Sequence, residues 1–272
     1  MRGIRFSMLI ATPLILGALY TGVKLFYFGE DSFLISFIAL FALSLAIFFA
    51  KEEINYWYDE KFPPKLDPPI IAWLSNFFPF YGQLEKDDKA KFETRLALYL
   101  NARSFKLMLK EKKSIPEDFK AIIAAHAIQM TLGVKDFLVG DYDRIIIYNH
   151  PFPSPLHKFL HTVEVHHDDG LILLSLEQLM SSIGQPAKNF NIAYYAYAQA
   201  LLHLYPTLME VPSVDPEAIL PYDRRHITNL TGFEEVNQDA LSLSAFFINN
   251  GGFQAKWPET YDAYQDLSLI HI

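Results

Sequence analysis

The chain contains no cysteine among its 272 residues, so it forms no disulfide and offers no thiolate to a metal ion. It also lacks a run of Lys and Arg, and its formal net charge is -8. Because phosphate binding requires a concentrated basic surface, this charge argues against a nucleic-acid partner. We find neither a glycine-rich phosphate loop nor a nucleophile elbow, which argues against nucleotide and serine-hydrolase chemistry. Any metal ion would depend on His, Asp or Glu side chains.

Two long stretches near the N-terminus are almost free of charge. The first covers residues 7–28 and contains only Lys24, and the second covers residues 32–50 and contains no charged residue. Each has about the length that a helix needs to cross the hydrocarbon core of a bilayer. Only Gly29-Glu30-Asp31 separates them, which predicts an antiparallel transmembrane hairpin within residues 1–52. A signal peptide is the alternative for the first stretch, because basic residues precede it.

The charges that flank the two stretches predict an orientation. Basic residues lie before the first stretch and after the second, namely Arg2, Arg5, Lys51, Lys61 and Lys65, whereas the link carries Glu30 and Asp31. The positive-inside rule then places both termini and the main domain in the cytoplasm, with the hairpin in a bacterial inner membrane. The lipid bilayer is thus the first predicted partner.

Four prolines between Pro63 and Pro69 predict a stiff linker, assigned to residues 53–69, because each proline removes a hydrogen-bond donor and favours extended geometry before it. The rest of the chain, residues 70–272, is predicted to form one domain. Apolar spacing of three and four, together with capping residues and prolines, predicts helices at 70–80, 84–109, 117–132, 190–205, 234–248 and 258–269. Strands are predicted at 144–148, 159–165 and 171–174, the last two as a hairpin. The predicted fold class is α+β, rich in helix with a small β-sheet.

Several motifs of this domain, taken in order, resemble the Mlc titration factor A family of zinc-dependent peptidases. They are Phe92-Glu93-Thr94-Arg95, Ser104-Phe105, Ile123-Ala124-Ala125-His126-Ala127, Leu132-Gly133, Ile145-Ile146-Ile147-Tyr148, the segments 170–176, 191–201 and 240–247, and Trp257-Pro258-Glu259-Thr260-Tyr261. The resemblance covers the chain from about Tyr81 to Leu269. It implies a gluzincin-like metallopeptidase fold with zinc as the expected cofactor.

In that family the helix matching residues 191–201 carries His-Glu-x-x-His, in which two histidines bind zinc and the glutamate is the general base. The resemblance places the first histidine at Tyr195, the glutamate at Ala196 and the second histidine at Gln199. It places a third zinc ligand, a glutamate, at Asn237. All four residues are changed. We therefore expect no bound zinc and no peptidase activity, since both the metal ligands and the general base are missing.

The same helix offers a second interpretation. Tyr195, Gln199 and His203 are spaced four apart, so with Asn237 they are candidates for a polar cleft that binds a peptide or small ligand. The simpler alternative is that these side chains only satisfy one another inside the protein. His126, on an alanine-rich helix, is interpreted as a core histidine.

A relocated metal site is the alternative that would keep the protein an enzyme. His157 and His161 have the metalloprotease spacing, and His166 lies near them with Glu164 and further carboxylates. Lys158 stands where the glutamate of the motif would be, and the segment is predicted to be extended, so a solvated polar hairpin is the simpler interpretation.

Two functions from different classes follow. The first is a membrane-anchored pseudopeptidase that faces the cytoplasm and binds a protein or peptide within a membrane complex. The alternative is an active metal-dependent peptidase or hydrolase that uses the relocated histidine and carboxylate site. A purely structural membrane protein is a third possibility.

Overall fold

The computed structural model describes residues 5–108 and 115–266 and divides the chain into two compact units, residues 1–64 and 65–272. The predicted boundary at residue 69 lies five residues after this division. Each unit is described by itself below.

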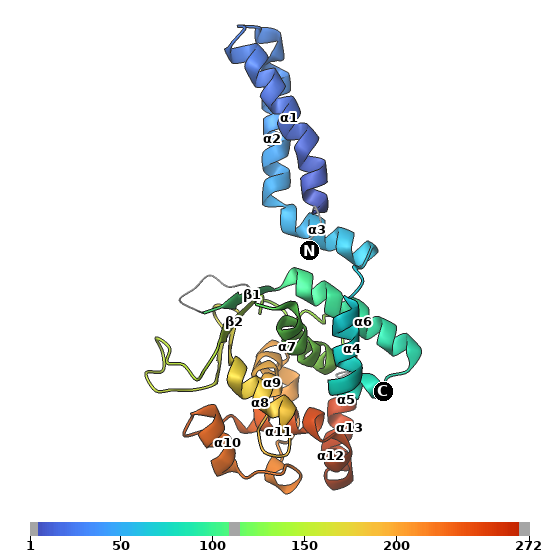
Figure 1. Cartoon of the computed structure of the whole chain (residues 1–272), viewed down its shortest axis with the longest axis vertical. Coiled ribbons are helices and arrows are strands. Elements are labelled where there is room, and N and C mark those ends of the chain that lie inside the picture. The colour runs from blue at the N-terminus through green and yellow to red at the C-terminus, as the bar shows by residue number, and fades with distance from the viewer. Residues whose placement is uncertain (1–4, 109–114, 267–272) are drawn as a thin grey trace. The chain divides into compact units, whose positions relative to one another are not determined.

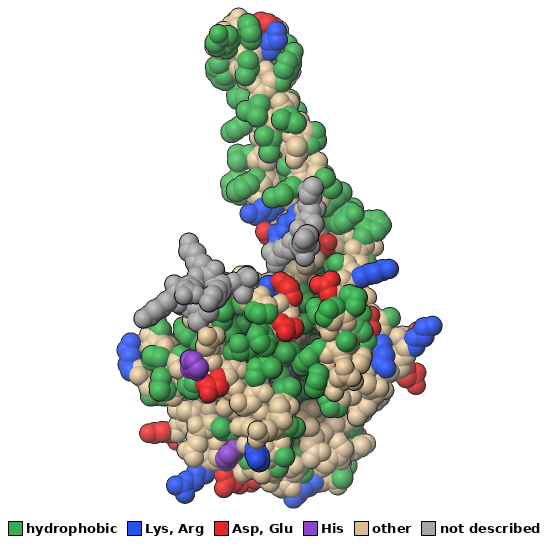
Figure 2. Space-filling model, in the orientation of Figure 1, with side chains coloured by type: hydrophobic (Ala, Val, Ile, Leu, Met, Phe, Trp, Pro, Cys, Tyr) green, Lys and Arg blue, Asp and Glu red, His purple; other side chains and the backbone are tan. Residues whose placement is uncertain are grey.

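The smaller unit contains two apolar helices that pack against each other (Figure 1), α1 (Phe6–Phe26) and α2 (Leu34–Phe49), joined by the short helix η1 (Asp31–Phe33). Glycines of α1 bring the helices close, since a Cβ at Gly17 would lie 3.1 Å from the side chain of Leu40. Both stretches have the length and apolar character of a membrane span, with mean hydropathies of 1.7 and 2.5. The expected pair of apolar helices is confirmed, and Figure 2 shows the hydrophobic side chains along them.

A third helix of this unit, α3 (Lys51–Lys61), occupies the first half of the predicted linker. It is tied to the start of α1, where the side-chain oxygen of Asn55 accepts a hydrogen bond from the Ser7 N–H at 2.9 Å. The rings of Phe6 and Tyr58 also stack at 4.3 Å. Only residues 62–67 lie outside the helices here, between α3 and the helix that begins at Pro68. The prediction that the linker begins at residue 53 is therefore wrong.

The larger unit is rich in helix, with a small sheet. Its helices are α4 (Pro68–Phe77), α5 (Pro79–Gln83), α6 (Lys86–Ala102), α7 (Glu117–Met130), α8 (Leu176–Gly184), α9 (Ile192–Leu204), α10 (Arg224–Thr231), α11 (Gln238–Ile248), α12 (Asn250–Lys256) and α13 (Pro258–Asp266), with short turns η2 (Pro206–Glu210) and η3 (Pro216–Ala218). Its strands are β1 (Ser104–Leu107), β2 (Arg144–Tyr148), β3 (Val163–His166) and β4 (Leu171–Ser175). The predicted α+β class and small sheet are confirmed.

The four strands form one mixed sheet in the order β1-β2-β4-β3. β1, β2 and β4 run parallel, and β3 returns antiparallel to β4 across the Asp168-Asp169-Gly170 turn. The predicted β3–β4 hairpin is confirmed. β3 is an edge strand of the sheet, and α9 packs against it.

Helix α9 lies at the centre of the core. Ten of its thirteen residues are buried, and it packs against α7, α8, α11 and strands β3 and β4. Such all-round burial explains why α9 shows apolar residues on every side rather than one apolar stripe.

Several predicted boundaries are wrong. The helix expected to run to residue 109 ends at Ala102, and the chain continues as β1, which pairs with β2. The strand expected from residue 159 begins at Val163, because the chain before it forms a loop that closes on itself. The last three residues of the helix expected at 258–269 lie outside the described residues.

Candidate functional site

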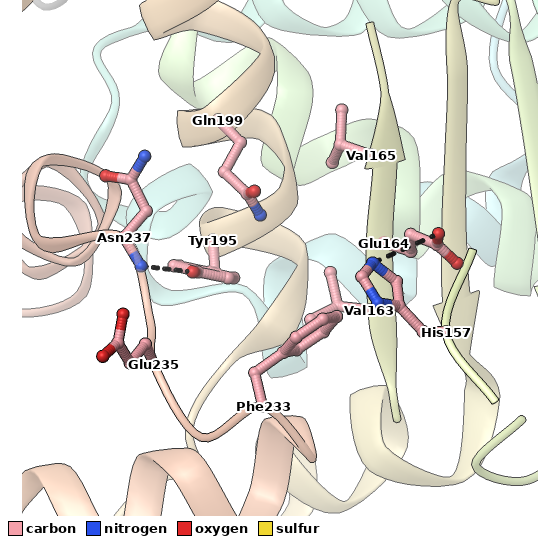
Figure 3. A pocket seen from close by; sticks show the side chains of 9 residues that line it. All are labelled: His157, Val163, Glu164, Val165, Tyr195, Gln199, Phe233, Glu235 and Asn237. Carbon is pink, nitrogen blue, oxygen red and sulfur yellow. Dashed lines mark hydrogen bonds and ion pairs between the residues drawn. The ribbon is translucent and has the colours of Figure 1, made fainter. Parts of the chain in front are cut away.

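A pocket of about 220 Å³ opens between α9, the edge strand β3 and the segment before α11. Figure 3 shows the side chains that line it, which are His157, Val163, Glu164, Val165, Tyr195, Gln199, Phe233, Glu235 and Asn237. Three of the four residues predicted for a polar cleft are therefore neighbours here. The fourth, His203, is not among them.

Tyr195 and Gln199 face the pocket because residues four apart on a helix lie on the same side. Figure 3 shows the Tyr195 hydroxyl pointing toward Asn237, and the Gln199 side chain extending from the next turn of α9. Gln199 is half-buried, and among the described residues its amide makes no hydrogen bond. Ala196 is fully buried and does not line the pocket.

The third residue, Asn237, is the N-cap of α11. Its side-chain oxygen accepts a hydrogen bond from the Ala240 N–H at 3.0 Å, and its own N–H donates to the Tyr195 hydroxyl at 2.9 Å. Asn237 thus precedes α11, so the prediction that this helix begins at residue 234 is wrong. The contact joins α9 to the start of α11 at the point where the resemblance expects a metal ion.

These residues do not fit zinc. Burial raises the pKa of the Tyr195 phenol to about 12, against the lowering effect of the hydrogen bond from Asn237, so the phenol stays neutral at physiological pH. The Asn237 side chain is engaged as a helix cap, and Gln199 supplies only an amide. Zinc binds imidazole, thiolate and carboxylate ligands, none of which is present at these positions.

His203 lies outside the pocket, which corrects its assignment to the predicted cleft. A spacing of eight residues moves it about 12 Å along the helix axis from Tyr195 and turns it around the axis. Its ring instead stacks on the ring of His167 at 4.4 Å. Burial lowers the pKa of His167, and the charge of the neighbouring His203 lowers it further.

The main-chain groups of β3 form one side of the pocket. The Ser175 N–H donates to the Thr162 carbonyl at 2.7 Å, and the antiparallel register continues through Glu164 opposite Leu173. Since hydrogen-bonded and non-hydrogen-bonded pairs alternate in such a ladder, the N–H and C=O groups of Val163 and Val165 point away from β4. Within the described residues these outward groups have no hydrogen-bond partner. We call this two-residue stretch the open edge because its outward main-chain groups are unpaired beside the pocket, although Val163 is only 1% exposed and Val165 is half-buried.

The open edge stops at Thr162. The Thr162 N–H donates to the Thr231 carbonyl at 2.9 Å, and its hydroxyl donates to the Leu230 carbonyl at 2.9 Å. The end of α10 thus occupies the position that a longer pairing partner would need.

The predicted relocated metal site forms a cluster around one buried carboxylate. The Nε2 atoms of His161 and His166 each lie 2.9 Å from an oxygen of Glu164, and that of His157 lies 3.7 Å away. The Glu164 side chain is only 4% exposed and that of His161 is fully buried. The solvated hairpin expected from the sequence is thus wrong for Glu164 and His161, whose side chains are buried, whereas the His157 side chain is 36% exposed.

The carboxylate of Glu164 is held ionised. Burial alone would raise its pKa, but hydrogen bonds from Ser154 and His161 and the charge of His166 lower it below its ordinary value. The Nε2 atom of His166 is buried and makes no hydrogen bond, although it lies close to the carboxylate. In residues 5–108 and 115–266 we find no group of three or more His, Asp or Glu side chains arranged to hold a metal ion.

Some lining residues were not predicted from the sequence. Val163 and Val165 look like ordinary strand residues, and their main-chain groups matter only because β3 lies at the edge of the sheet. Phe233 and Glu235 enter through the segment that joins α10 to α11. Helix α10 itself was not predicted, although Asp223 before it and Gly232 after it are typical capping residues.

In sequence comparisons no known protein family and no curated protein matches the chain. The resemblance to the Mlc titration factor A family therefore stays a prediction.

Proposed function

We propose that the protein is a membrane-anchored pseudopeptidase that binds an extended polypeptide segment in the cleft between β3 and α9. The open edge of β3 within the pocket is the observation that carries this proposal. An extended segment placed there adds a strand to the sheet through the free main-chain groups of Val163 and Val165. The bound segment belongs to a protein partner within a membrane complex.

The neutral residues opposite the edge suit binding better than catalysis. Tyr195 and Asn237 are joined by a hydrogen bond, and Ala196 has no group that takes up a proton. The free amide of Gln199 both donates and accepts hydrogen bonds, so it is suited to pair with the main-chain N–H and C=O groups of a bound segment. Losing a general base alone lowers a hydrolysis rate by about two to four orders of magnitude.

The anchor in this proposal is the hairpin of α1 and α2. Its flanking charges support an orientation with both termini and the larger unit on the cytoplasmic side of a bacterial inner membrane. Partners that reach the cleft are then cytoplasmic proteins or cytoplasmic segments of membrane proteins.

Substitution of the free edge tests the binding mode. Peptides are selected from a random-sequence display library with the full chain in lipid nanodiscs. Val165→Pro removes an outward N–H at an edge position where proline is tolerated, and we expect it to weaken the selected peptides about tenfold. The matched control Val165→Thr keeps the N–H and should bind as the original chain does. Failure to select any peptide, or equal binding by the proline variant, would contradict strand addition.

Metal analysis tests the absence of catalysis. The purified full chain should contain no stoichiometric zinc and should leave an unstructured peptide uncut. Zinc at one ion per chain, with cleavage that a chelator abolishes, would sink the pseudopeptidase proposal.

The second candidate function is a metal-dependent hydrolase at the cluster of His157, His161 and His166. It is favoured by one observation, the approach of all three imidazoles to Glu164. It requires these side chains to turn toward a common ion. It predicts metal in the purified protein and loss of that metal in the double variant His157→Ala, His161→Ala.

A further inference from the structure

The loop between β2 and β3 exposes apolar side chains at its outer end. We name residues Pro155–Leu160 the apolar loop; Figure 1 shows this connection extending from the sheet. Leu156, Phe159 and Leu160 are 68%, 46% and 64% exposed. Among the described residues of the larger unit, the large apolar side chains that are exposed are Phe77, Met108, Leu156, Phe159, Leu160 and Met209. Half of them therefore fall within five consecutive residues.

The exposure of these side chains is built into the fold. At the base of the loop Phe152 and His161 exchange main-chain hydrogen bonds of 2.9 and 3.1 Å. Above this pair the Ser154 N–H donates to the His157 carbonyl at 2.7 Å, and the His157 N–H donates to the Ser154 hydroxyl at 3.0 Å. The Phe159 ring meets the ring of Phe233 edge-on at 5.4 Å. A loop so constrained presents its apolar side chains outward, and patches of this kind mark interaction surfaces.

The loop also carries one positive charge. Lys158 lies between the exposed apolar residues, the loop contains no acidic residue, and within the described residues Lys158 has no ion-pair partner. One basic side chain among exposed apolar ones suits the interface of an anionic membrane, because each Lys near such a surface is attracted to it.

In the proposed anchor, a short link tethers the start of α4 to the hairpin. Only residues 62–67 separate α3 from α4, and a link of that length spans at most about 25 Å. Three apolar side chains bind a bilayer weakly on their own, but a short tether raises their effective concentration at its surface. A weak contact is then sufficient to keep the apolar loop at the bilayer surface.

We propose that the apolar loop inserts Leu156, Phe159 and Leu160 into the headgroup region of the bilayer that holds the hairpin, with Lys158 beside anionic lipid. This inference rests on the membrane anchor of the proposed function. His157 and Phe233 both contact Phe159 and both line the pocket, so the insertion holds one end of the cleft at the membrane surface. The cleft then meets polypeptide segments that lie close to the bilayer.

Spin labelling tests the contact directly, because the chain has no cysteine of its own. A nitroxide is attached to Leu160→Cys in the full chain, reconstituted in vesicles of phosphatidylcholine and phosphatidylglycerol. Its collisions with oxygen, which partitions into lipid, are compared with its collisions with a water-soluble nickel chelate. We expect the ratio of oxygen to nickel accessibility to be several-fold higher than at Met209→Cys, an exposed apolar position elsewhere. Lys158→Glu should shift the Leu160→Cys label toward water.

The possible outcomes separate the loop from the anchor. A label at Ile38→Cys in α2 reports on the anchor, and if it is found in water both the anchor and the inference are overturned. If it lies in lipid while the loop label is in water, only the inference fails. Low accessibility to both reagents at Leu160→Cys would show that protein covers the loop, which overturns the lipid contact. If the label at Met209→Cys also lies in lipid, the assignment of the lipid contact to the apolar loop is overturned.

Discussion

His126 lies inside α7 and is 1% exposed. Its Nδ1–H donates to the Ile122 carbonyl at 2.7 Å, which leaves Nε2 to accept a hydrogen bond from the Asn191 amide at 2.9 Å. Asn191 in turn caps the first turn of α9 through a hydrogen bond from the Ala193 N–H. The histidine therefore joins α7 to the start of α9, and its interpretation as a core residue is confirmed.

Burial makes the stability of the larger unit depend on this histidine at acid pH. Burial lowers the pKa of His126 to about 4, although the bond to the Ile122 carbonyl opposes the shift. Between about pH 6.5 and 4 the unfolded chain takes up a proton that the folded chain refuses. The contribution of neutral His126 to the free energy of unfolding is complete above about pH 6.5 and is lost as the pH falls toward 4.

His126→Gln should reveal this dependence, since glutamine does not titrate. At neutral pH we expect the variant to be less stable than the original chain. By pH 4.5 the difference in the free energy of unfolding should narrow by roughly 2 kcal/mol. Denaturant unfolding of both proteins at the two pH values measures it, and a constant difference would contradict the assigned neutral histidine.

At the scale of elements, the link between α10 and β3 depends on one glycine. Gly232 ends α10 with a φ of 85°, in the left-handed region. A Cβ there would lie 2.3 Å from the Leu160 carbonyl and 2.7 Å from the Cα of His161. The same contact region holds the hydrogen bonds from Thr162 to Leu230 and Thr231 that close one end of the open edge.

Gly232→Ala should therefore destabilise the larger unit by about 2–4 kcal/mol, from the strained φ and from the displaced main chain of Leu160 and His161. The matched control is Gly184→Ala, at the end of α8, where an added Cβ meets nothing within 4 Å. The control should be neutral or slightly stabilising. Thermal unfolding in detergent compares them, and equal midpoints for the two variants would show that the contact is unimportant.

For the whole molecule, the proposed topology places the link between α1 and α2 on the side of the membrane opposite the larger unit. Asp31 lies at the start of η1 and is exposed, while Glu259 lies on α13 and is also exposed. Because the chain contains no cysteine, one introduced at either position is the only thiol.

A membrane-impermeant maleimide should label Asp31→Cys in intact bacterial cells from which the outer membrane has been removed. Glu259→Cys should react only after the inner membrane is permeabilised, with at least a several-fold increase. The chain without cysteine provides the background. Labelling of Glu259→Cys in intact cells would reverse the orientation, and equal labelling of both positions would argue against a hairpin that crosses the membrane.

Local patterns were enough to predict much of the fold. The two apolar helices could be predicted because each is a continuous run of apolar residues with the length of a candidate membrane span. The strand at Arg144–Tyr148 and the hairpin into Leu171 could be predicted from β-branched runs and a turn. The strand β1 could not, because Ser104–Leu107 continues an apolar spacing that also suits a helix. Its pairing with Arg144–Ile147, forty residues away, decides its conformation.

The candidate site, like the fold, could be predicted from the sequence only in part. The sequence by itself determined that Tyr195, Ala196 and Gln199 lie on one helix without a zinc ligand or general base, because that depends only on residue type and helical spacing. Only the tertiary structure decided that Asn237 contacts Tyr195, that Glu164 is buried among histidines and that β3 has an open edge. These features depend on contacts between segments far apart in the chain. A local sequence pattern does not determine such long-range contacts.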